Sequence, residues 1–303
     1  MKAMEKIAAF GDLCGECPVW DAESSNLYWT DCGGFRFYRY RSAENKAELL
    51  RTGVEVNGFR LNRSGGFVVT NNSGVWLWSN PDAELKPVAT SAGGRPCRLN
   101  DCVADSKGRL IAGSWFYDPA AEYALGQLIR VDTSGAVSIL DDGYHLSNGK
   151  AFSPDGSKLY ATDSAARIIY EYDYDADAGT ARNRRVRVRV PSEEGLPDGL
   201  RVDASGFLWS AQWYGSCVVR YDPDGKEERR IATPAKQTSC ITFGGPSLTT
   251  LYITTAAQSE PMPVMPPGYD AVKGHFGGEL YRIELDIQGL PDLSANITVV
   301  STK

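Results

Sequence analysis

Six polar residues recur along this 303-residue chain at intervals of 41 to 50 residues, and each is followed 10 to 12 residues later by a short apolar run. These residues, called the anchors below, are Glu16, Asn57, Asn100, Asn148, Asp198 and Ser239. Repeats of this length are typical of β-propellers, in which one repeat forms one four-stranded blade. We therefore predict an all-β protein, a six-bladed β-propeller with four-stranded antiparallel blades around a central channel.

The repeat that contains Asp198 shows the strand pattern most clearly. Apolar residues alternate at 200–202 and again at 207–209, which is the period-two pattern of half-buried strands. Segment 203–206 between them has the composition of a tight turn, because Asp can bond its own backbone and Gly tolerates a positive φ. Third and fourth strands are expected further along each repeat, for example at 168–172 and 185–190.

Composition narrows the class of protein. No Pro/Gly/Ser-rich linker divides the repeats, so residues 1–303 are predicted to form a single domain. The net charge of −6 argues against nucleic acid or an anionic membrane as the main partner. The alternating basic segment 184–189 is better explained as the exposed face of an outer strand. We expect a monomer or a weak homo-oligomer.

The chain shows neither a signal-peptide core near its start nor an apolar run of transmembrane length. A cytoplasmic location is therefore expected, with the seven cysteines present as reduced thiols. Cys14 and Cys17 have the spacing of a metal-binding pair, but no second Cys or His pair completes a structural zinc site.

The anchors point to a site in the channel. An isolated anchor could be an ordinary turn residue, and Pro197 and Gly199 are expected to place Asp198 in a tight turn. Six anchors in register, two of them acidic, favour convergence at one end of the channel. Glu16, Asn148 and Asp198 form an all-oxygen set, which Ca²⁺, Mg²⁺ and Mn²⁺ prefer. The chain has only two histidines, so a His-based zinc site or a Ser-His-Asp triad has little support.

Other residues near the anchors suggest a small-molecule substrate. Arg98 and Asn100 are two apart, so both side chains can face one side and bind hydroxyl or carboxyl groups. The alternative is that Arg98 pairs with Asp101 on a loop. The aromatic loop at 115–123 could cover the mouth of a pocket. The Pro-rich insertion at 258–274 is equally compatible with a second lid and with a disordered surface loop.

Five motifs resemble, in order, those of the SMP-30/gluconolactonase/luciferin-regenerating enzyme family, which includes regucalcin and sugar lactonases. They are the segments 15–20, 98–101, 147–149, 197–199 and 238–245. The resemblance implies a six-bladed propeller with one catalytic divalent metal ion in its channel. It places the metal ligands on Glu16, Asn148 and Asp198, and it places substrate contacts on Arg98, Asn100 and, by a looser match, Glu122. Cys17, Cys102 and Trp115 depart from the family pattern, which bears on the substrate.

From these observations we predict a divalent-metal-dependent lactonase that hydrolyses a sugar lactone to the hydroxy acid. Asp198 is expected to be both a metal ligand and the general base. Ca²⁺ is the first expectation for the metal, with Mg²⁺, Mn²⁺ and Zn²⁺ as alternatives. One alternative function is hydrolysis of another ester or a phosphotriester at the same site. The other is a non-catalytic propeller that binds calcium or a protein partner.

Overall fold

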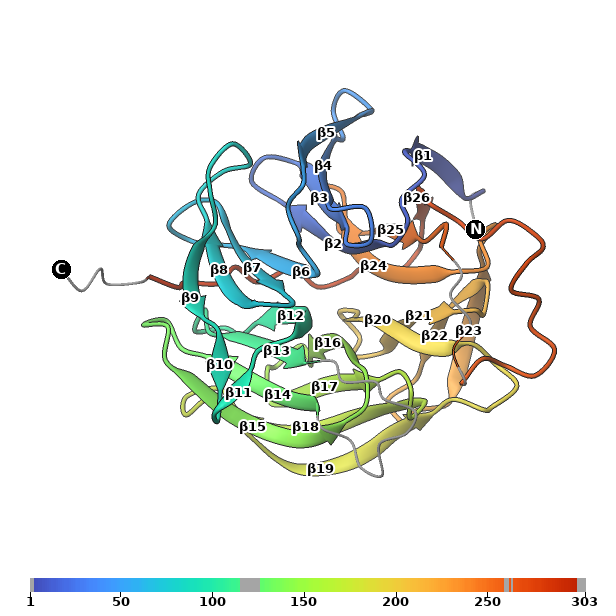
Figure 1. The fold of residues 1–303 in the computed structure, drawn as a ribbon. Helices are drawn as coiled ribbons and strands as arrows, with labels where there is room; N and C mark the ends of the chain where they lie inside the picture. The colour runs from blue at the N-terminus through green and yellow to red at the C-terminus, as the bar shows by residue number, and fades with distance from the viewer. Residues whose placement is uncertain (1–2, 115–125, 259–261, 263, 299–303) are drawn as a thin grey trace.

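The fold is a ring of six four-stranded antiparallel sheets, as predicted from the repeats (Figure 1). The structure is a computed structural model, and it describes residues 3–114, 126–258, 262 and 264–298. From the channel outward, blade one contains β2 (Gly15–Asp21), β3 (Asn26–Asp31), β4 (Arg36–Arg41) and β5 (Lys46–Thr52). Blade two contains β6 (Gly58–Leu61), β7 (Phe67–Asn71), β8 (Gly74–Trp78) and β9 (Lys86–Ala89). A short hairpin of β10 (Ser91–Ala92) and β11 (Arg95–Pro96) follows.

The next three blades repeat this order. Blade three contains β12 (Leu99–Ala104), β13 (Leu110–Ser114), β14 (Gly126–Val131) and β15 (Val137–Tyr144). Blade four contains β16 (Ser147–Phe152), β17 (Lys158–Asp163), β18 (Ile168–Asp175) and β19 (Thr180–Arg189). Blade five contains β20 (Leu196–Val202), β21 (Leu208–Trp213), β22 (Cys217–Tyr221) and β23 (Glu227–Ala232).

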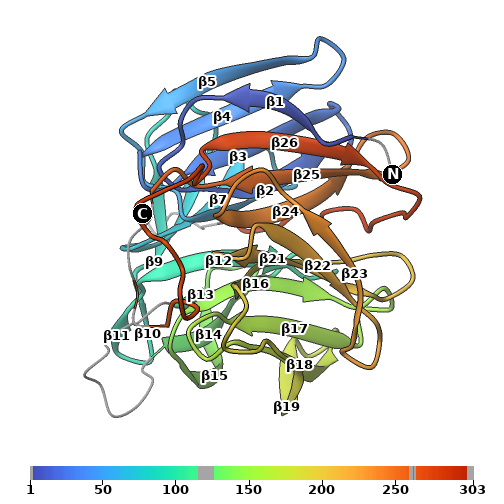
Figure 2. The same ribbon diagram turned by 90° about the vertical axis from the view of Figure 1, so that its right-hand side faces the viewer.

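Blade six joins the two ends of the chain. Its inner strands are β24 (Thr238–Gly244), β25 (Thr250–Thr255) and β26 (Glu279–Glu284), while its outermost strand is β1 (Glu5–Ala9). Figure 2 shows β1 lying beside β26. The predicted repeats start at Glu16 and do not include β1. Its pairing supplies the fourth strand of blade six and closes the ring.

Packing between blades explains the buried strand patterns. Each innermost strand lies against the innermost strands of the two neighbouring blades, so every residue of β20 and of β24 is buried. Aromatic side chains fill the space between blades one and two, where Phe37 meets Phe59 and Trp78 edge-on at ring-centroid distances of 5.0 and 4.9 Å. Such pairs add to the stabilisation that comes from burying apolar area.

The basic segment at 184–189 forms part of the outermost strand of blade four, as predicted. Arg182–Arg185 are exposed, and Arg185 pairs with Asp173 of β18 at 2.9 Å. Charged side chains on an outer strand discourage pairing with another chain. Within the described ranges, no helix is long and apolar enough to cross a bilayer.

After β26, residues 286–298 form a segment that we call the C-terminal strap. It runs across the turns between the innermost and second strands (Figure 1). The backbone N–H of Ala204 donates to Gln288, and the N–H of Asn296 donates to Gly108, at 2.9 and 2.8 Å. The strap therefore lies at the end of the channel opposite the start of the innermost strands.

Candidate functional site

The anchors lie at equivalent places in the ring, at or just before the start of the innermost strand of each blade. In five blades the pairing of the innermost strand with the second strand is irregular at or beside the anchor. Such bulges rotate a side chain away from the regular alternation and are common beside active sites. Here they fall at five of the six anchors. The predicted tight turn at Asp198 is wrong, because Leu196–Val202 is one strand with a bulge between Pro197 and Leu200.

Glycines after the anchors let the innermost strands approach one another. A Cβ added to Gly149 would lie 2.5 Å from the backbone oxygen of Asp198. A Cβ added to Gly199 would lie 2.6 Å from the Cα of Cys240. A side chain at either position would push adjacent blades apart. The Asn-Gly and Asp-Gly pairs thus mark close contacts between blades.

Hydrogen bonds link the anchor side chains to the neighbouring blades. Asn57 Nδ2 donates to the backbone oxygen of Leu99 at 2.9 Å, and Ser239 Oγ donates to that of Gly15. These two anchors are therefore engaged in holding the ring together. Asn100 Nδ2 instead donates to Asn148 Oδ1, and Asn148 Nδ2 donates to Ser164 Oγ at 2.8 Å. These bonds orient the amide oxygen of Asn148.

The two acidic anchors interact electrostatically, and Asp198 is buried while Glu16 is half-buried. Asp198 is 6% exposed, and no described residue donates a hydrogen bond to its carboxylate. Burial raises the pKa of Asp198 well above its usual range, and the nearby charges of Glu16 and Asp101 raise it further. Burial, together with the charge of Asp101, raises the pKa of Glu16 to about 8. Three acidic groups in one buried region favour a bound cation or protons.

Two further charged residues belong to this region and were not predicted. Asp101 is buried within β12, and its Oδ1 accepts a hydrogen bond from the N–H of Cys102 at 2.7 Å. None of the described ion pairs joins it to Arg98, so the alternative pairing on a loop is wrong. Lys150 is also buried, and its Nζ donates to the backbone oxygen of Asn148 at 2.5 Å. Burial lowers the pKa of Lys150 to about 8. The sequence offered a signal for both residues, because Asp101 directly follows Asn100 and Lys150 comes two residues after Asn148.

The remaining predicted residues have different surroundings. Arg98 is exposed just before β12 and has no ion-pair partner in the part of the chain that the structure describes. Glu122 and the aromatic loop at 115–123 lie outside the described residues.

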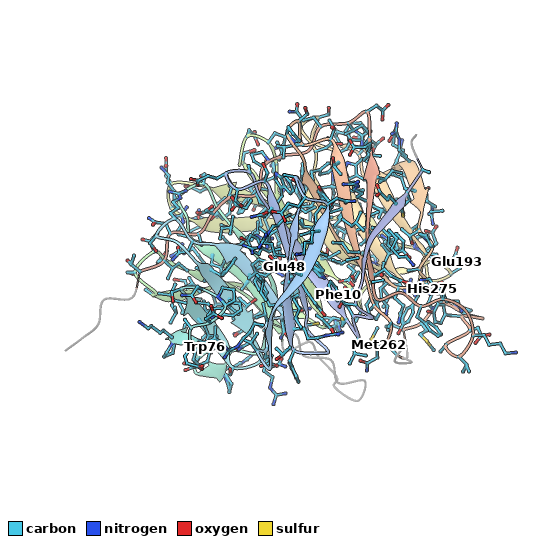
Figure 3. All side chains as sticks on the ribbon, turned by 90° about the horizontal axis from the view of Figure 1, so that it is seen from above. Phe10, Glu48, Trp76, Glu193, Met262 and His275 are labelled. Carbon is cyan, nitrogen blue, oxygen red and sulfur yellow. The ribbon has the colours of Figure 1, made fainter. Side chains whose placement is uncertain are left out.

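The described part of the Pro-rich insertion packs onto the anchor face of the ring. Arg167 Nη2 donates to the backbone oxygen of Val264 at 2.7 Å, and Tyr269 contacts Tyr214 at a centroid distance of 4.6 Å. Lys236 Nζ donates to the backbone oxygen of Asp270 at 2.8 Å. Figure 3 shows Met262, His275 and Glu193 on one side of the molecule. Of the two alternatives for this insertion, the contacts favour a folded cover.

The two cysteines with metal-pair spacing face different surroundings. Cys17 has a φ of 46° within the bulge, and its buried Sγ lies 3.3 Å from Arg60 Nη1. Cys14 instead lies opposite Cys32, whose N–H donates to the backbone oxygen of Cys14 at 3.0 Å. Across the described ranges, no group of three or more His, Cys, Asp or Glu side chains could hold a metal ion. An ion at the anchors would therefore need the amide oxygen of Asn148 beside the two carboxylates.

Fold and site together define a six-bladed propeller whose channel carries buried oxygen donors at one end. The family model described as SMP-30/Gluconolactonase/LRE-like region matches residues 14–257, and the chain belongs to this family. The chain is 33% identical over 283 residues to pentonolactonase XacC of Haloferax volcanii, which covers 93% of this chain and 94% of that protein. It is also 33% identical to a 6-deoxy-6-sulfogluconolactonase of Pseudomonas putida, over 82% of this chain and 84% of the relative. A solved luciferin-regenerating enzyme superposes with a TM-score of 0.84 at 26% identity, over 97% and 99% of the two chains.

Proposed function

We propose that this protein is a divalent-metal-dependent lactonase that hydrolyses a sugar lactone to the corresponding hydroxy acid. The observation that carries the proposal is the crowding of Glu16, Asp101 and Asp198 at one buried end of the channel. Relatives with the names of sugar lactonases align with more than four-fifths of the chain, which supports the choice of substrate class.

The residues present fit a divalent cation. Glu16 and Asp198 would supply two carboxylates and Asn148 an amide oxygen, which is the donor set of a hard cation such as Ca²⁺, with Mg²⁺, Mn²⁺ and Zn²⁺ as alternatives. The positive charge would also favour the ionised form of both acids, whose pKa values are raised by burial and by the repulsion of neighbouring acids. When bound, the ion polarises the lactone carbonyl as a Lewis acid.

Side chains of the protein carry out the proton transfer and orient the substrate. Water attacks the carbonyl carbon, and Asp198 accepts the proton of that water at a carboxylate oxygen. The bond between the carbonyl carbon and the ring oxygen then breaks, and the ring oxygen takes up the proton that Asp198 accepted and becomes the hydroxyl of the product. Asn100 and Arg98 orient the hydroxyl groups of the sugar lactone. Glu122, which lies outside the described residues, is a further proposed substrate contact.

The proposal is tested by measuring acid release from a panel of aldonolactones before and after chelation. Chelation should abolish hydrolysis, and Ca²⁺, Mg²⁺ or Mn²⁺ should restore it. An aryl ester and a phosphotriester in the same panel test the alternative substrate classes. Full lactone hydrolysis by the metal-free protein would refute the metal requirement, and no hydrolysis of any lactone with any of these ions would refute the lactonase proposal.

A further inference from the structure

Two cysteines at the anchor end of blade one lie directly opposite each other. Cys14 directly precedes β2 and Cys32 directly follows β3, and the register of these strands pairs Gly15 with Asp31. The next pair along is therefore Cys14 with Cys32, and the N–H of Cys32 donates to the backbone oxygen of Cys14 at 3.0 Å. Opposed residues joined by such a bond have Cα atoms about 5.5 Å apart. That separation lies within the range that a disulfide bridges.

The side chains of this pair also contact each other. Cys32 Sγ lies 3.4 Å from the backbone oxygen of Cys14, and a hydrogen bond joins the two thiols. Side chains of directly opposed residues stand on the same face of a sheet. A disulfide between them therefore requires rotation of the side chains and no separation of the strands.

Exposure distinguishes this pair from the other cysteines. Cys14 and Cys32 are half-buried, whereas the remaining five cysteines are buried. Cys17 has the C-x-x-C spacing with Cys14, but its Sγ instead lies 3.3 Å from Arg60 Nη1. Oxidation of a thiol depends on access, so a water-soluble oxidant should reach Cys14 and Cys32 first.

Blade four has the same arrangement with different side chains. The N–H of Leu146 donates to Asp163 at 3.1 Å, and the N–H of Ser164 donates to the backbone oxygen of Leu146 at 3.0 Å. Cys14 and Cys32 make the corresponding bonds in blade one. Cys32 and Ser164 also each come 16 residues after the anchor of their blade. Ser164 therefore occupies in blade four the place that Cys32 occupies in blade one.

This place in a blade lies beside the anchors. Ser164 Oγ accepts a hydrogen bond from Asn148 Nδ2 at 2.8 Å, so it orients a proposed metal ligand. In blade one, the charges of Glu16 and Asp198 act on the cysteine pair. A covalent change in the pair would therefore reach the proposed cation site.

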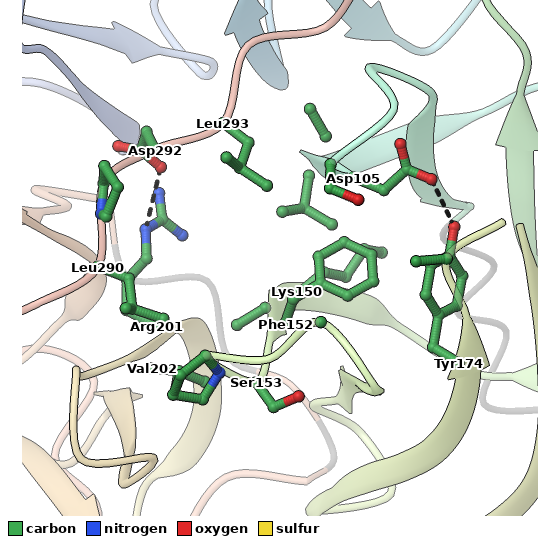
Figure 4. A pocket seen from close by; sticks show the side chains of 18 of the residues that line it. Asp105, Lys150, Phe152, Ser153, Tyr174, Arg201, Val202, Leu290, Asp292 and Leu293 are labelled. Carbon is green, nitrogen blue, oxygen red and sulfur yellow. Dashed lines mark hydrogen bonds and ion pairs between the residues drawn. The ribbon is translucent and has the colours of Figure 1, made fainter.

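The opposite end of the channel has no comparable pair. A cavity of about 280 Å³ lies there, drawn in Figure 4. Its carboxylates are engaged by the protein: Asp105 accepts from the hydroxyl of Tyr174 at 2.7 Å, and Asp292 lies 3.7 Å from Arg201. None of the described residues that line this cavity is a cysteine. Of the seven cysteines, the two accessible ones thus both lie at the anchor end.

We propose that Cys14 and Cys32 form a reversible oxidation site, and that their disulfide weakens cation binding at the anchors. The second part rests on the proposed function. The oxidant is a hydroperoxide, which takes up the two electrons that the two sulfurs lose. One thiolate attacks a peroxide oxygen, and the O–O bond breaks to give a sulfenic acid and an alcohol, or water from hydrogen peroxide. The other thiolate attacks the sulfenic sulfur, so the S–S bond forms and water leaves. The two protons released by the thiols end on the alcohol and the water, and a small thiol reverses the reaction by exchange.

Peptide mapping tests whether the bond forms. The full chain is treated with hydrogen peroxide for several hours, because negative charge at the anchors disfavours a thiolate beside them. Free thiols are then alkylated, and the chain is cut with trypsin and a Glu-specific protease. The three cysteines of blade one fall on separate peptides, 7–16, 17–23 and 24–36. A disulfide should link 7–16 to 24–36. The absence of this link, or a link from 7–16 to 17–23 instead, would overturn the proposal.

Calorimetry tests the effect on the cation. Ca²⁺ should bind the oxidised protein more weakly than the reduced protein by about tenfold, the scale for disturbing a residue that orients a metal ligand. Reduction with dithiothreitol should restore the affinity. Equal affinities before and after oxidation, or a loss that reduction does not reverse, would overturn the proposal. If the reduced protein binds no divalent ion, the proposed function fails, and the peptide map still decides whether the disulfide forms.

Two serine variants serve as a matched pair. Cys32→Ser introduces the side chain that blade four has at this place, so it should fold, and peroxide should leave its Ca²⁺ affinity unchanged. Cys217 is buried in blade five, where its Sγ accepts from Arg230 Nη1 at 3.6 Å, a bond that a serine hydroxyl can also accept. Cys217→Ser should therefore form the disulfide as the wild type does. A peroxide effect on Ca²⁺ binding that persists in Cys32→Ser would place the oxidation elsewhere and overturn the proposal.

Discussion

The chemistry proposed for the channel depends on Asp198 more than on any other side chain. Its carboxylate is 6% exposed, and no described residue donates a hydrogen bond to it. A carboxylate buried beside other acids is costly for folding alone, so the position of Asp198 favours a functional role. Asn57 and Ser239 occupy equivalent places but bond to the backbone of the next blade, which separates these structural anchors from those proposed to act in hydrolysis.

Replacing Asp198 by Asn removes the proton acceptor and one negative charge while keeping the shape and one oxygen ligand. We expect kcat for lactone hydrolysis to fall by about 10²-fold or more, the usual scale for losing a general base. The measurement is made at saturating metal, so that weakened metal binding is not mistaken for lost chemistry. A kcat close to that of the wild type would remove Asp198 from the role of base.

Arg98→Ala should behave differently from Asp198→Asn. Arg98 is exposed at the anchor end, and its proposed role is to orient the substrate. Its loss should therefore act mainly on KM, and a lactone with different hydroxyl groups should be affected less. A large fall in kcat with an unchanged KM would show that Arg98 acts in the chemical step instead.

The raised pKa of Glu16 predicts how stability depends on pH when no metal is bound. The folded protein holds a proton on Glu16 up to a pKa of about 8, whereas the unfolded chain loses it near 4.5. The folded state thus binds more protons between these values, so its stability falls as pH rises through this window. In chelator, the melting temperature should be lower at pH 8.5 than at pH 5.5. Glu16→Gln should reduce this difference, and excess Ca²⁺ should remove it. Equal melting temperatures in chelator at both pH values would contradict the prediction.

At the scale of the strand, the site depends on the bulges and on the glycines beside the anchors. The bulges interrupt the regular strand pairing at the anchors, and glycine lets each innermost strand lie against the next. The proposed metal ligands come from three blades, so they can meet only if both conditions hold. The elements therefore position the site as much as the anchor residues do.

Gly149→Ala tests the close contact between β16 and β20. The new Cβ would lie 2.5 Å from the backbone oxygen of Asp198, and overpacking of this kind costs about 1–3 kcal/mol. Chemical denaturation should show a larger loss than in Gly156→Ala, where nothing lies within 4 Å and only the φ of 70° opposes the substitution. Equal losses in the two variants would mean that the strands separate without cost.

At the scale of the whole molecule, β1 closes the ring and the C-terminal strap covers the end opposite the anchors. Glu5 of β1 pairs with Arg282 of β26 at 2.8 Å, and Asp292 of the strap accepts from the N–H of Trp20 at 3.2 Å. Both segments connect parts of the chain more than 270 residues apart. We expect the ring to unfold in one cooperative transition, as the single-domain prediction requires.

Ala8→Pro tests the closure. Pro cannot donate to the pairing between β1 and β26, so the edge of β26 should become exposed. We expect a lower melting temperature and faster aggregation on heating, measured by calorimetry and light scattering. Ala8→Ser is the matched control and should behave as the wild type does. An unchanged melting temperature in Ala8→Pro would show that β1 contributes little to stability.

The sequence alone was sufficient to predict six blades, the antiparallel strands within them and the equivalent position of one anchor in each repeat. Strand alternation and turn chemistry depend on near neighbours, so the segment from Leu200 to Trp209 shows them directly. A repeat also makes equivalent residues equivalent in space, which is why the spacing of Asn148 and Asp198 suffices to place both on the same channel.

Only the tertiary structure decided the features that need the ring to be closed. The pairing of β1 with β26, the burial of Asp101 and Lys150, and the course of the strap all depend on contacts between distant segments. Asn-Gly and Asp-Gly pairs are locally typical of turns, and only the neighbouring blade shows that they lie within strands. The physical reason is that local hydrogen bonding and periodicity are set by adjacent residues, whereas burial and charge crowding arise when six blades meet around one axis.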